Sequence, residues 1–156
     1  YVATFNETIE KLYAEEIENL GRIKLIGKRE IKRMNSSSAN SERLVKDTTN
    51  YAYVSEVDAA RLNIGELDLI DVSSEFGCIS LPAKVTDEMM PGTLAIPQCW
   101  GHQKADGLRH AQRHPGVNSN FLAGDGIGNI EKLSGMSHLS GILVDIKKSE
   151  RIAAVG

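Results

Sequence analysis

Three short segments carry side chains suited to binding a polar ligand. The first is Gly27-Lys28-Arg29, with Asn35 and Ser36 a few residues further on. Arginine presents a rigid fork of donors that suits phosphate oxygens or the edge of a heterocycle, and a nearby glycine lets a ligand approach backbone N–H groups. The same stretch also fits the solvated basic edge of a strand. That alternative would use Lys24, Lys28, Arg29, Lys32 and Arg33.

The second and third segments are Trp100-Gly101-His102 and Pro115-Gly116-Val117-Asn118-Ser119-Asn120. Asparagine amides offer both donors and acceptors, the set needed to read the edge of a heterocycle. Asparagine also tolerates left-handed backbone and caps its own loop, so turn formation is the competing explanation for Asn118 and Asn120. Trp100 fits either a stacking contact with a ligand or a place in the core.

Metal-binding and nucleophilic motifs are weaker. His102, His110 and His114 could supply three imidazoles to zinc, but Pro115 follows at once and no HExxH motif is present, which favours surface histidines. The glycine-rich segment from Gly124 to Asn129 fits neither the P-loop nor the EF-hand spacing. No GxSxG motif occurs. From these residues alone we expect a binding module, with no catalytic residue and no metal ligand.

The amino-terminal segment predicts an amphipathic helix. Its apolar residues from Thr4 to Leu20 recur at steps of three and four. Thr4 and Glu7 fit a capping box, and Gly21 stands where a left-handed cap is expected. From Arg22 to Ile26 polar and apolar residues alternate, which predicts the first strand of a domain.

Further strands are predicted between glycine- and proline-rich turns. A helix after the second of them would be capped by Ser55 with Asp58 and ended by Gly65. Gly77 would supply a positive φ in a hairpin turn. Segments 35–42 and 98–135 are predicted loops. Such a series predicts a mainly β fold, a small β-barrel with peripheral helices. The predicted strands are 22–26, 51–54, 67–72, 78–81, 93–96 and 141–146.

Length and charge set limits on function. The 156 residues are 41% hydrophobic and 25% charged, with a net charge of -3, as expected for one globular domain. No global basic field is available for a nucleic-acid backbone, so we predict no nucleic-acid partner. No apolar run approaches the length of a membrane span, and no export signal is visible. We therefore expect no membrane contact by this segment.

Taken in order, several segments resemble the C-terminal molybdopterin-dinucleotide-binding domain of the molybdopterin oxidoreductases. The relevant group is the dimethyl-sulfoxide-reductase type, which includes formate dehydrogenases and nitrate reductases. The resemblance covers roughly Arg22 to Lys148, although Met34 stands where relatives usually carry histidine and Leu67 where they carry glycine. The matching segments are 25–36, 50–54, 58–62, 91–92, 100–102, 115–120 and 133–135.

The resemblance implies a six-stranded double-psi β-barrel of the aspartate-decarboxylase-like kind. Residues 1–21 would be a lead-in helix, 22–148 the barrel domain and 149–156 a tail. The barrel would help hold a bis(molybdopterin guanine dinucleotide) cofactor with molybdenum or tungsten, shared with the remaining domains of a parent oxidoreductase. The implied cofactor-binding residues are Gly27, Lys28, Arg29, Asn35, Ser36, Trp100, Gly101, His102, Asn118 and Asn120.

On this interpretation the segment is a piece of a longer enzyme and has no turnover of its own. A cytoplasmic location is favoured, and a periplasmic one is compatible because an export signal would precede this segment. Two alternatives from other classes stay open at this point. One is a free-standing double-psi-barrel subunit that binds a partner without redox chemistry, since fold alone does not give function. The other is a small metal enzyme using His102, His110 and His114.

Overall fold

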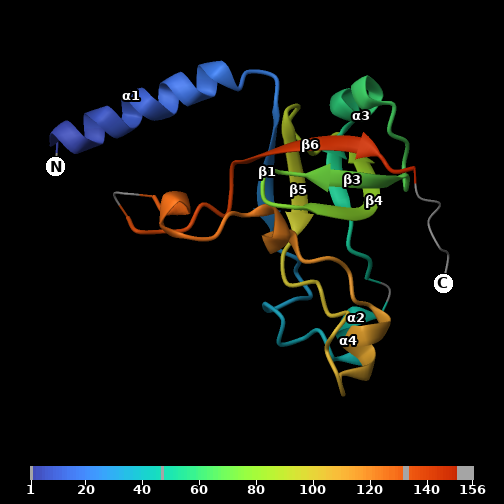
Figure 1. The fold of residues 1–156 in the computed structure, drawn as a ribbon. Helices are drawn as coiled ribbons and strands as arrows, with labels where there is room; N and C mark the ends of the chain where they lie inside the picture. Colours follow the sequence, from blue (N-terminus) through green and yellow to red (C-terminus); the bar gives the residue numbers. More distant parts are fainter. Residues whose placement is uncertain (1, 47, 132–133, 151–156) are drawn as a thin grey trace.

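Six strands close into a barrel in the computed structural model, which describes residues 2–46, 48–131 and 134–150 (Figure 1). The strands follow the order β1-β5-β2-β4-β3-β6, and β6 pairs back onto β1. The pairs β1/β5 and β2/β4 are parallel, and the other pairs are antiparallel. The predicted six-stranded barrel is confirmed. Its strands are β1 Ile23–Lys28, β2 Ala52–Ser55, β3 Leu69–Ser73, β4 Cys78–Thr86, β5 Thr93–Pro97 and β6 Ile142–Lys148.

The barrel interior is filled by aliphatic side chains from alternate strand positions. In β3, Ile70 and Val72 are fully buried, whereas Leu69 and Asp71 are partly exposed. This period of two is what places one side of each strand in the core. The same alternation buries Ile23, Leu25, Val54, Ile79, Leu81, Leu94, Ile96, Val144 and Ile146.

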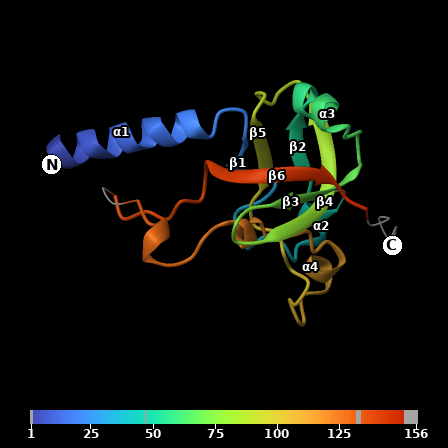
Figure 2. The same ribbon diagram turned by 45° about the horizontal axis from the view of Figure 1, so that its top comes forward.

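The predicted amino-terminal helix is present as α1, Val2–Glu18. It projects away from the barrel in both ribbon views, and none of its residues is buried (Figure 2). Because the helix already includes Val2, Thr4 lies inside it, and the predicted capping box of Thr4 with Glu7 is wrong. Gly21 does take the expected left-handed conformation, with φ +84°.

Helix α3, Glu56–Leu62, begins as predicted and ends earlier than predicted. The Ser55 hydroxyl accepts a hydrogen bond from the Asp58 N–H at 3.1 Å, which caps the first turn. Asn63, with φ +54°, ends the helix, so the prediction of Gly65 is wrong. Leu67 also has a positive φ, of +63°, which delays the start of β3 to Leu69.

Strands β3 and β4 form the predicted hairpin, with Ser73 opposite Cys78. Gly77 in its turn does not have a positive φ, so that prediction is wrong. Glycine is needed there for close approach, because a β-carbon on Gly77 would collide with the carbonyl oxygen of Phe121. Strand β4 continues to Thr86, five residues beyond the predicted end at Leu81, since it also pairs with β2.

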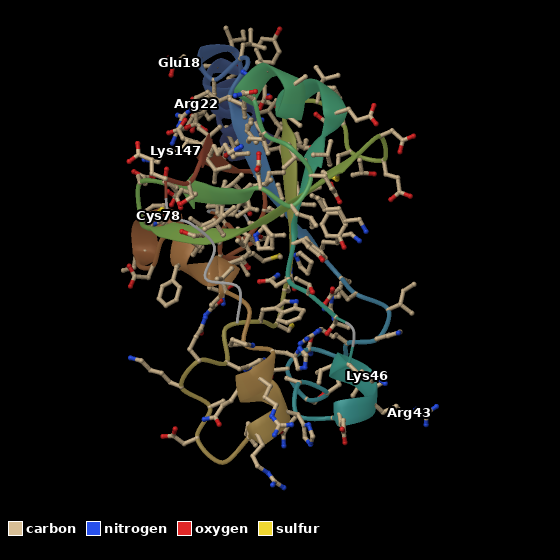
Figure 3. All side chains as sticks on the ribbon, turned by 90° about the vertical axis from the view of Figure 1, so that its right-hand side faces the viewer. Glu18, Arg22, Arg43, Lys46, Cys78 and Lys147 are labelled. Carbon is tan, nitrogen blue, oxygen red and sulfur yellow. The ribbon has the colours of Figure 1, made fainter. Side chains whose placement is uncertain are left out.

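Short helices lie directly after the first predicted loop and within the second. They are α2 Glu42–Val45, α4 Arg109–Arg113, and the 3-10 turns η1 Ser119–Leu122 and η2 Ile127–Asn129. Helices α2 and α4 lie together at one end of the molecule, and Figure 3 shows Arg43 and Lys46 there, at the far end from Glu18 and Arg22. The side chain of Asn40 accepts hydrogen bonds from the N–H groups of His110 and Ala111 at 3.0 and 3.3 Å. Tertiary contacts of this kind hold helices too short to form alone.

No helix in the described part of the chain is long and apolar enough to cross a membrane.

Candidate functional site

The parallel pairing of β1 and β5 brings two of the sequence motifs to the same edge of the barrel. Gly27 lies opposite Ile96 and Lys28 opposite Pro97. The Gln98 N–H donates to the Lys28 carbonyl at 3.0 Å, which extends the pairing past the end of β5. The chain therefore leaves both strands at one end, where ligands of parallel sheets commonly bind.

A cleft of about 440 Å³ opens at this end of the barrel. Its walls come from the ends of β1 and β5, the segment after β1, the Pro115–Asn120 segment and the start of β6. Six of the ten residues predicted from the sequence line it: Gly27, Asn35, Ser36, Trp100, Asn118 and Asn120. The lining residues that sequence reasoning missed include Gln98, Cys99, Ser119, Ala123 and Leu139.

Two glycines keep the backbone close to the cleft. A β-carbon on Gly27 would collide with the side-chain amide of Gln98, which packs directly over this glycine. Gly101 has φ +103°, and a β-carbon there would lie 2.6 Å from the β-carbon of Asn118. Gly101 thus requires glycine both for close packing and for its backbone conformation, whereas at Gly27 the contact is with the end of a flexible, exposed side chain that can move aside. Gln98 could have been found from its position two residues after the predicted strand 93–96, whose end lies at the cleft.

Gly101 and His102 hold the Pro115–Asn120 segment in place and do not line the cleft. Their N–H groups both donate to the Pro115 carbonyl, at 2.7 and 3.0 Å. The His102 Nε2 atom lies 3.1 Å from the Cys99 carbonyl oxygen, so its imidazole is engaged within its own loop. The structure therefore gives these two residues a supporting position beside the cleft.

The two asparagines of this segment differ in how their side chains are used. Asn118 Oδ1 accepts from the Asn120 N–H at 3.0 Å and caps η1, which is the turn-forming role considered from the sequence. The side chain of Asn120 has no hydrogen-bond partner among the described residues, and neither has that of Gln98. Both amides are exposed in the cleft and available to a ligand.

Arg29 and Lys28 lie outside the cleft itself. Arg29 Nη1 donates to Asn35 Oδ1 at 3.0 Å, and this contact places the guanidinium beside the cleft wall. Asn35 has φ +49°, a left-handed conformation that asparagine tolerates. The Lys28 ammonium instead lies 4.4 Å from the ring centroid of Tyr53, on the outer face of the barrel.

Trp100 is a buried wall between the cleft and the rest of the molecule. It is 5% exposed, and the guanidinium of Arg33 lies 3.5 Å from its ring centroid. Glu30 Oε2 accepts from Trp100 Nε1 at 3.1 Å and lies 3.0 Å from Arg33 Nε. Burial lowers the pKa of Arg33, while Glu30 and Cys99 act in the opposite direction. The solvated-edge interpretation is therefore wrong for Arg33, because its side chain is enclosed.

The three histidines considered for zinc are not assembled into a site. Among residues 2–46, 48–131 and 134–150, no group of three or more His, Cys, Asp or Glu side chains could hold a metal ion.

Comparison with known proteins identifies the family. The sequence profile described as "Molydopterin dinucleotide binding domain" matches residues 23–137, well over half of the chain. The chain belongs to this family. The resemblance inferred from the motifs is thus confirmed, and the domain is a cofactor-binding domain of the kind found in larger molybdopterin oxidoreductases. The matched range includes all ten predicted site residues.

Solved structures show the same fold. Acetylene hydratase from Pelobacter acetylenicus matches 89% of this chain with a TM-score of 0.70 and 20% sequence identity. The double-psi barrel predicted for this family is therefore confirmed. The chain covers only 20% of the length of acetylene hydratase. No curated protein sequence matches the chain.

Proposed function

We propose that this domain helps hold a bis(molybdopterin guanine dinucleotide) cofactor, carrying molybdenum or tungsten, in a larger oxidoreductase. The cleft at the ends of β1 and β5 would bind part of that cofactor. The observation that carries the proposal is the presence of unpaired amides, Gln98 and Asn120, beside closely packed backbone at Gly27 in one cleft.

The donor set of the cleft fits such a ligand. Guanine and pterin edges present alternating donors and acceptors, which amides such as those of Gln98 and Asn120 match. A diphosphate needs cationic or N–H donors, and Arg29 lies beside the cleft wall through its bond to Asn35. The Gly27 backbone and the buried Trp100 complete the wall of the cleft on this side.

The residues of this chain would bind and orient the cofactor, and the cofactor when bound would supply two-electron redox chemistry at its metal. We assign no catalytic role to any residue here. The remaining domains of the parent protein would complete the cofactor site and supply the metal's protein ligand. The cleft is consistent with this division, because its walls come from one end of a single barrel.

A pair of asparagine variants in the full-length parent tests the proposal. We expect Asn120→Ala to lower the molybdenum or tungsten and the pterin bound per chain, because a typical hydrogen bond contributes roughly 0.5–1.5 kcal/mol. Asn129→Ala is the matched control. Its side chain donates to the Asp125 carbonyl at 2.9 Å in a loop that does not line the cleft. Equal cofactor content in both variants would contradict the assignment of Asn120.

A further inference from the structure

A second cavity, of about 330 Å³, lies on the other side of Trp100 from the cofactor cleft. Residues of the β3–β4 hairpin and the segment 48–50 bound it on one part of its wall. Arg113, the last residue of α4, and the residues 114–117 that follow this helix complete the wall. Trp100 lines both this cavity and the cofactor cleft. Asn50, in contrast, lines only this second cavity and not the cleft.

A buried amide in this cavity lacks a partner. Asn50 is 4% exposed, and its Oδ1 atom accepts from the Val117 N–H at 2.9 Å. This bond orients the amide, and its Nδ2 atom then has no hydrogen-bond partner in the part of the chain that the structure describes. An unsatisfied buried donor of this kind is unfavourable, so its presence at a cavity wall indicates a hydrogen-bond acceptor that enters from outside.

The remaining polar groups of the cavity divide into engaged and free ones. The Ser80 hydroxyl donates to Asp71 Oδ1 at 2.6 Å, and the Thr48 hydroxyl donates to the Val45 carbonyl at 2.7 Å. The side chains of Thr49, Arg113 and His114, which also line the cavity, form no ion pair or hydrogen bond with any described residue. The free groups are therefore the Asn50 amide N–H, the Thr49 hydroxyl, the His114 imidazole and the cationic Arg113 guanidinium. A set made up of potential donors that includes one fixed positive charge favours an anionic acceptor.

The rest of the lining is apolar. Leu69, Pro82, Pro115 and Val117 contribute, together with the ring of Trp100. A phosphate would leave most of its oxygens unpaired against such a surface, whereas a carboxylate with a short alkyl chain matches both parts of the lining.

We propose that this cavity binds a small monocarboxylate. Its carboxylate would accept hydrogen bonds from Asn50 Nδ2 and from the Arg113 guanidinium, and its alkyl chain would pack on the prolines and Val117. The site is separate from the cofactor cleft and does not depend on the function proposed for that cleft. Since Asn50 also holds the Val117 N–H, one amide would link this ligand to the segment that lines the cleft.

Trp100, the single tryptophan of the sequence, provides a built-in reporter. Butyrate titrated into the full chain should change its fluorescence in a saturable way, and should shift the side-chain amide resonances of Asn50 in an NMR spectrum. Butyramide and inorganic phosphate are the comparison ligands. Binding of either as tight as that of butyrate would overturn the carboxylate assignment, as would the absence of saturable binding by butyrate.

Variants of Arg113 and Asn50 test the two proposed donors, and a variant of Arg109 is the control. Arg113→Gln should weaken butyrate binding about tenfold or more, as expected for loss of a charge-assisted hydrogen bond. Arg109→Gln, on the same helix but outside the cavity lining, should leave the affinity unchanged. Asn50→Asp retains an oxygen to accept the Val117 N–H but replaces the free donor by an oxygen that repels carboxylates, so it should abolish binding. Unchanged affinity in Arg113→Gln would overturn the proposal even if Asn50→Asp failed to fold.

Discussion

Leu67 adopts a backbone conformation that is costly for a residue with a side chain. Its φ of +63° lies in the left-handed region, where a β-carbon costs roughly 1–2 kcal/mol relative to the right-handed one. The side chain is 59% exposed, so it recovers little of that free energy by packing. Its N–H donates to the Ala83 carbonyl at 2.9 Å, and this contact with β4 holds the conformation in place.

We expect Leu67→Gly to stabilise the domain by about 0.5–1 kcal/mol. Glycine removes the left-handed strain, while part of the gain is offset by the larger conformational entropy of glycine in the unfolded chain. Urea unfolding measures the difference. Asn63→Gly is the control, because Asn63 is also left-handed, with φ +54°, but asparagine already tolerates this region. A loss of stability in Leu67→Gly would contradict the argument.

Asp58 is a buried carboxylate that joins α3 to the start of β5. It accepts from the Ser55 hydroxyl and the Gly92 N–H, both at 2.7 Å, and from Arg61 at 2.9 Å. Burial acts to raise the pKa of Asp58, but these hydrogen bonds outweigh it and lower the pKa below 3.8. The ionised form is therefore favoured more strongly in the folded chain than in the unfolded one.

This depressed pKa predicts a contribution to acid sensitivity. The stabilisation is complete above the ordinary pKa of 3.8 and is lost as pH falls through the lower pKa of the folded state. Asp58→Asn should lower the free energy of unfolding by roughly 1.5–3 kcal/mol at neutral pH and flatten its decline below about pH 4. Unfolding curves at a series of pH values check both effects. Asp68→Asn, which alters a more exposed carboxylate paired with Lys148, should have a smaller effect.

Side-chain roles were only partly predictable from the sequence. For Asn118, the choice between turn formation and ligand binding depended on whether its Oδ1 atom accepts a hydrogen bond from the Asn120 N–H. The spacing of residues in the sequence could not decide this. Arg33 resembled the exposed basic residues around it, yet it is enclosed by Trp100, which lies far from it in the sequence, and pairs with Glu30 three residues before it. A contact between residues so far apart in the chain cannot be predicted from the local sequence pattern.

Among the elements, strands were easier to predict than the short helices between them. Alternation over β1 and β3 follows from local burial, so both strands were found within two residues of their observed starts. Helix α4 has five residues and depends on Asn40, which caps two of its N–H groups from a distant segment. The helix propensity of residues 109–113 gives no indication of such a contact with a distant segment.

The β3–β4 turn depends on a contact with η1 at Gly77. A β-carbon there would meet the carbonyl oxygen of Phe121, and a backbone atom cannot move aside as a flexible side chain could. Gly77→Ala should therefore destabilise the domain by roughly 1–3 kcal/mol, the range for overpacking a tight site. Gly128→Ala is matched to it, since nothing lies within 4 Å of the added carbon and its φ is not positive. Equal thermal stability of the two variants would show that the turn can relax.

At the scale of the whole molecule, the cleft at the ends of β1 and β5 exists because two strands distant in the sequence run parallel. Gly27 and Ile96 are neighbours across β1 and β5, although three other barrel strands, β2, β3 and β4, intervene along the chain. Periodicity predicted each strand but not its partner, because a parallel pair requires a long crossover that leaves no local signal. The family resemblance supplied the barrel topology that the pattern of residues could not.

Helix α1 has the amphipathic pattern of a packed helix but lies apart from the barrel. Phe5, Ile9, Leu12 and Ile17 form its apolar stripe, and each is about half exposed. The ion pair of Glu16 with Lys24 joins its carboxyl end to β1, and such exposed pairs contribute little. The barrel core in turn contains no residue from Val2–Glu18. The free energy of unfolding of the barrel should therefore be nearly independent of this helix.

Deletion of residues 1–18 tests that independence. We expect the unfolding free energy of the barrel, measured by urea with β-sheet circular dichroism, to change by less than about 1 kcal/mol, the usual limit for an exposed ion pair. Leu94→Ala in the same assay should cost roughly 2–5 kcal/mol, because Leu94 is fully buried in the core and its removal leaves a cavity. A deletion effect as large as that of Leu94→Ala would mean that α1 packs on the barrel in solution. A small effect would leave the apolar stripe of α1 available for contacts outside the barrel.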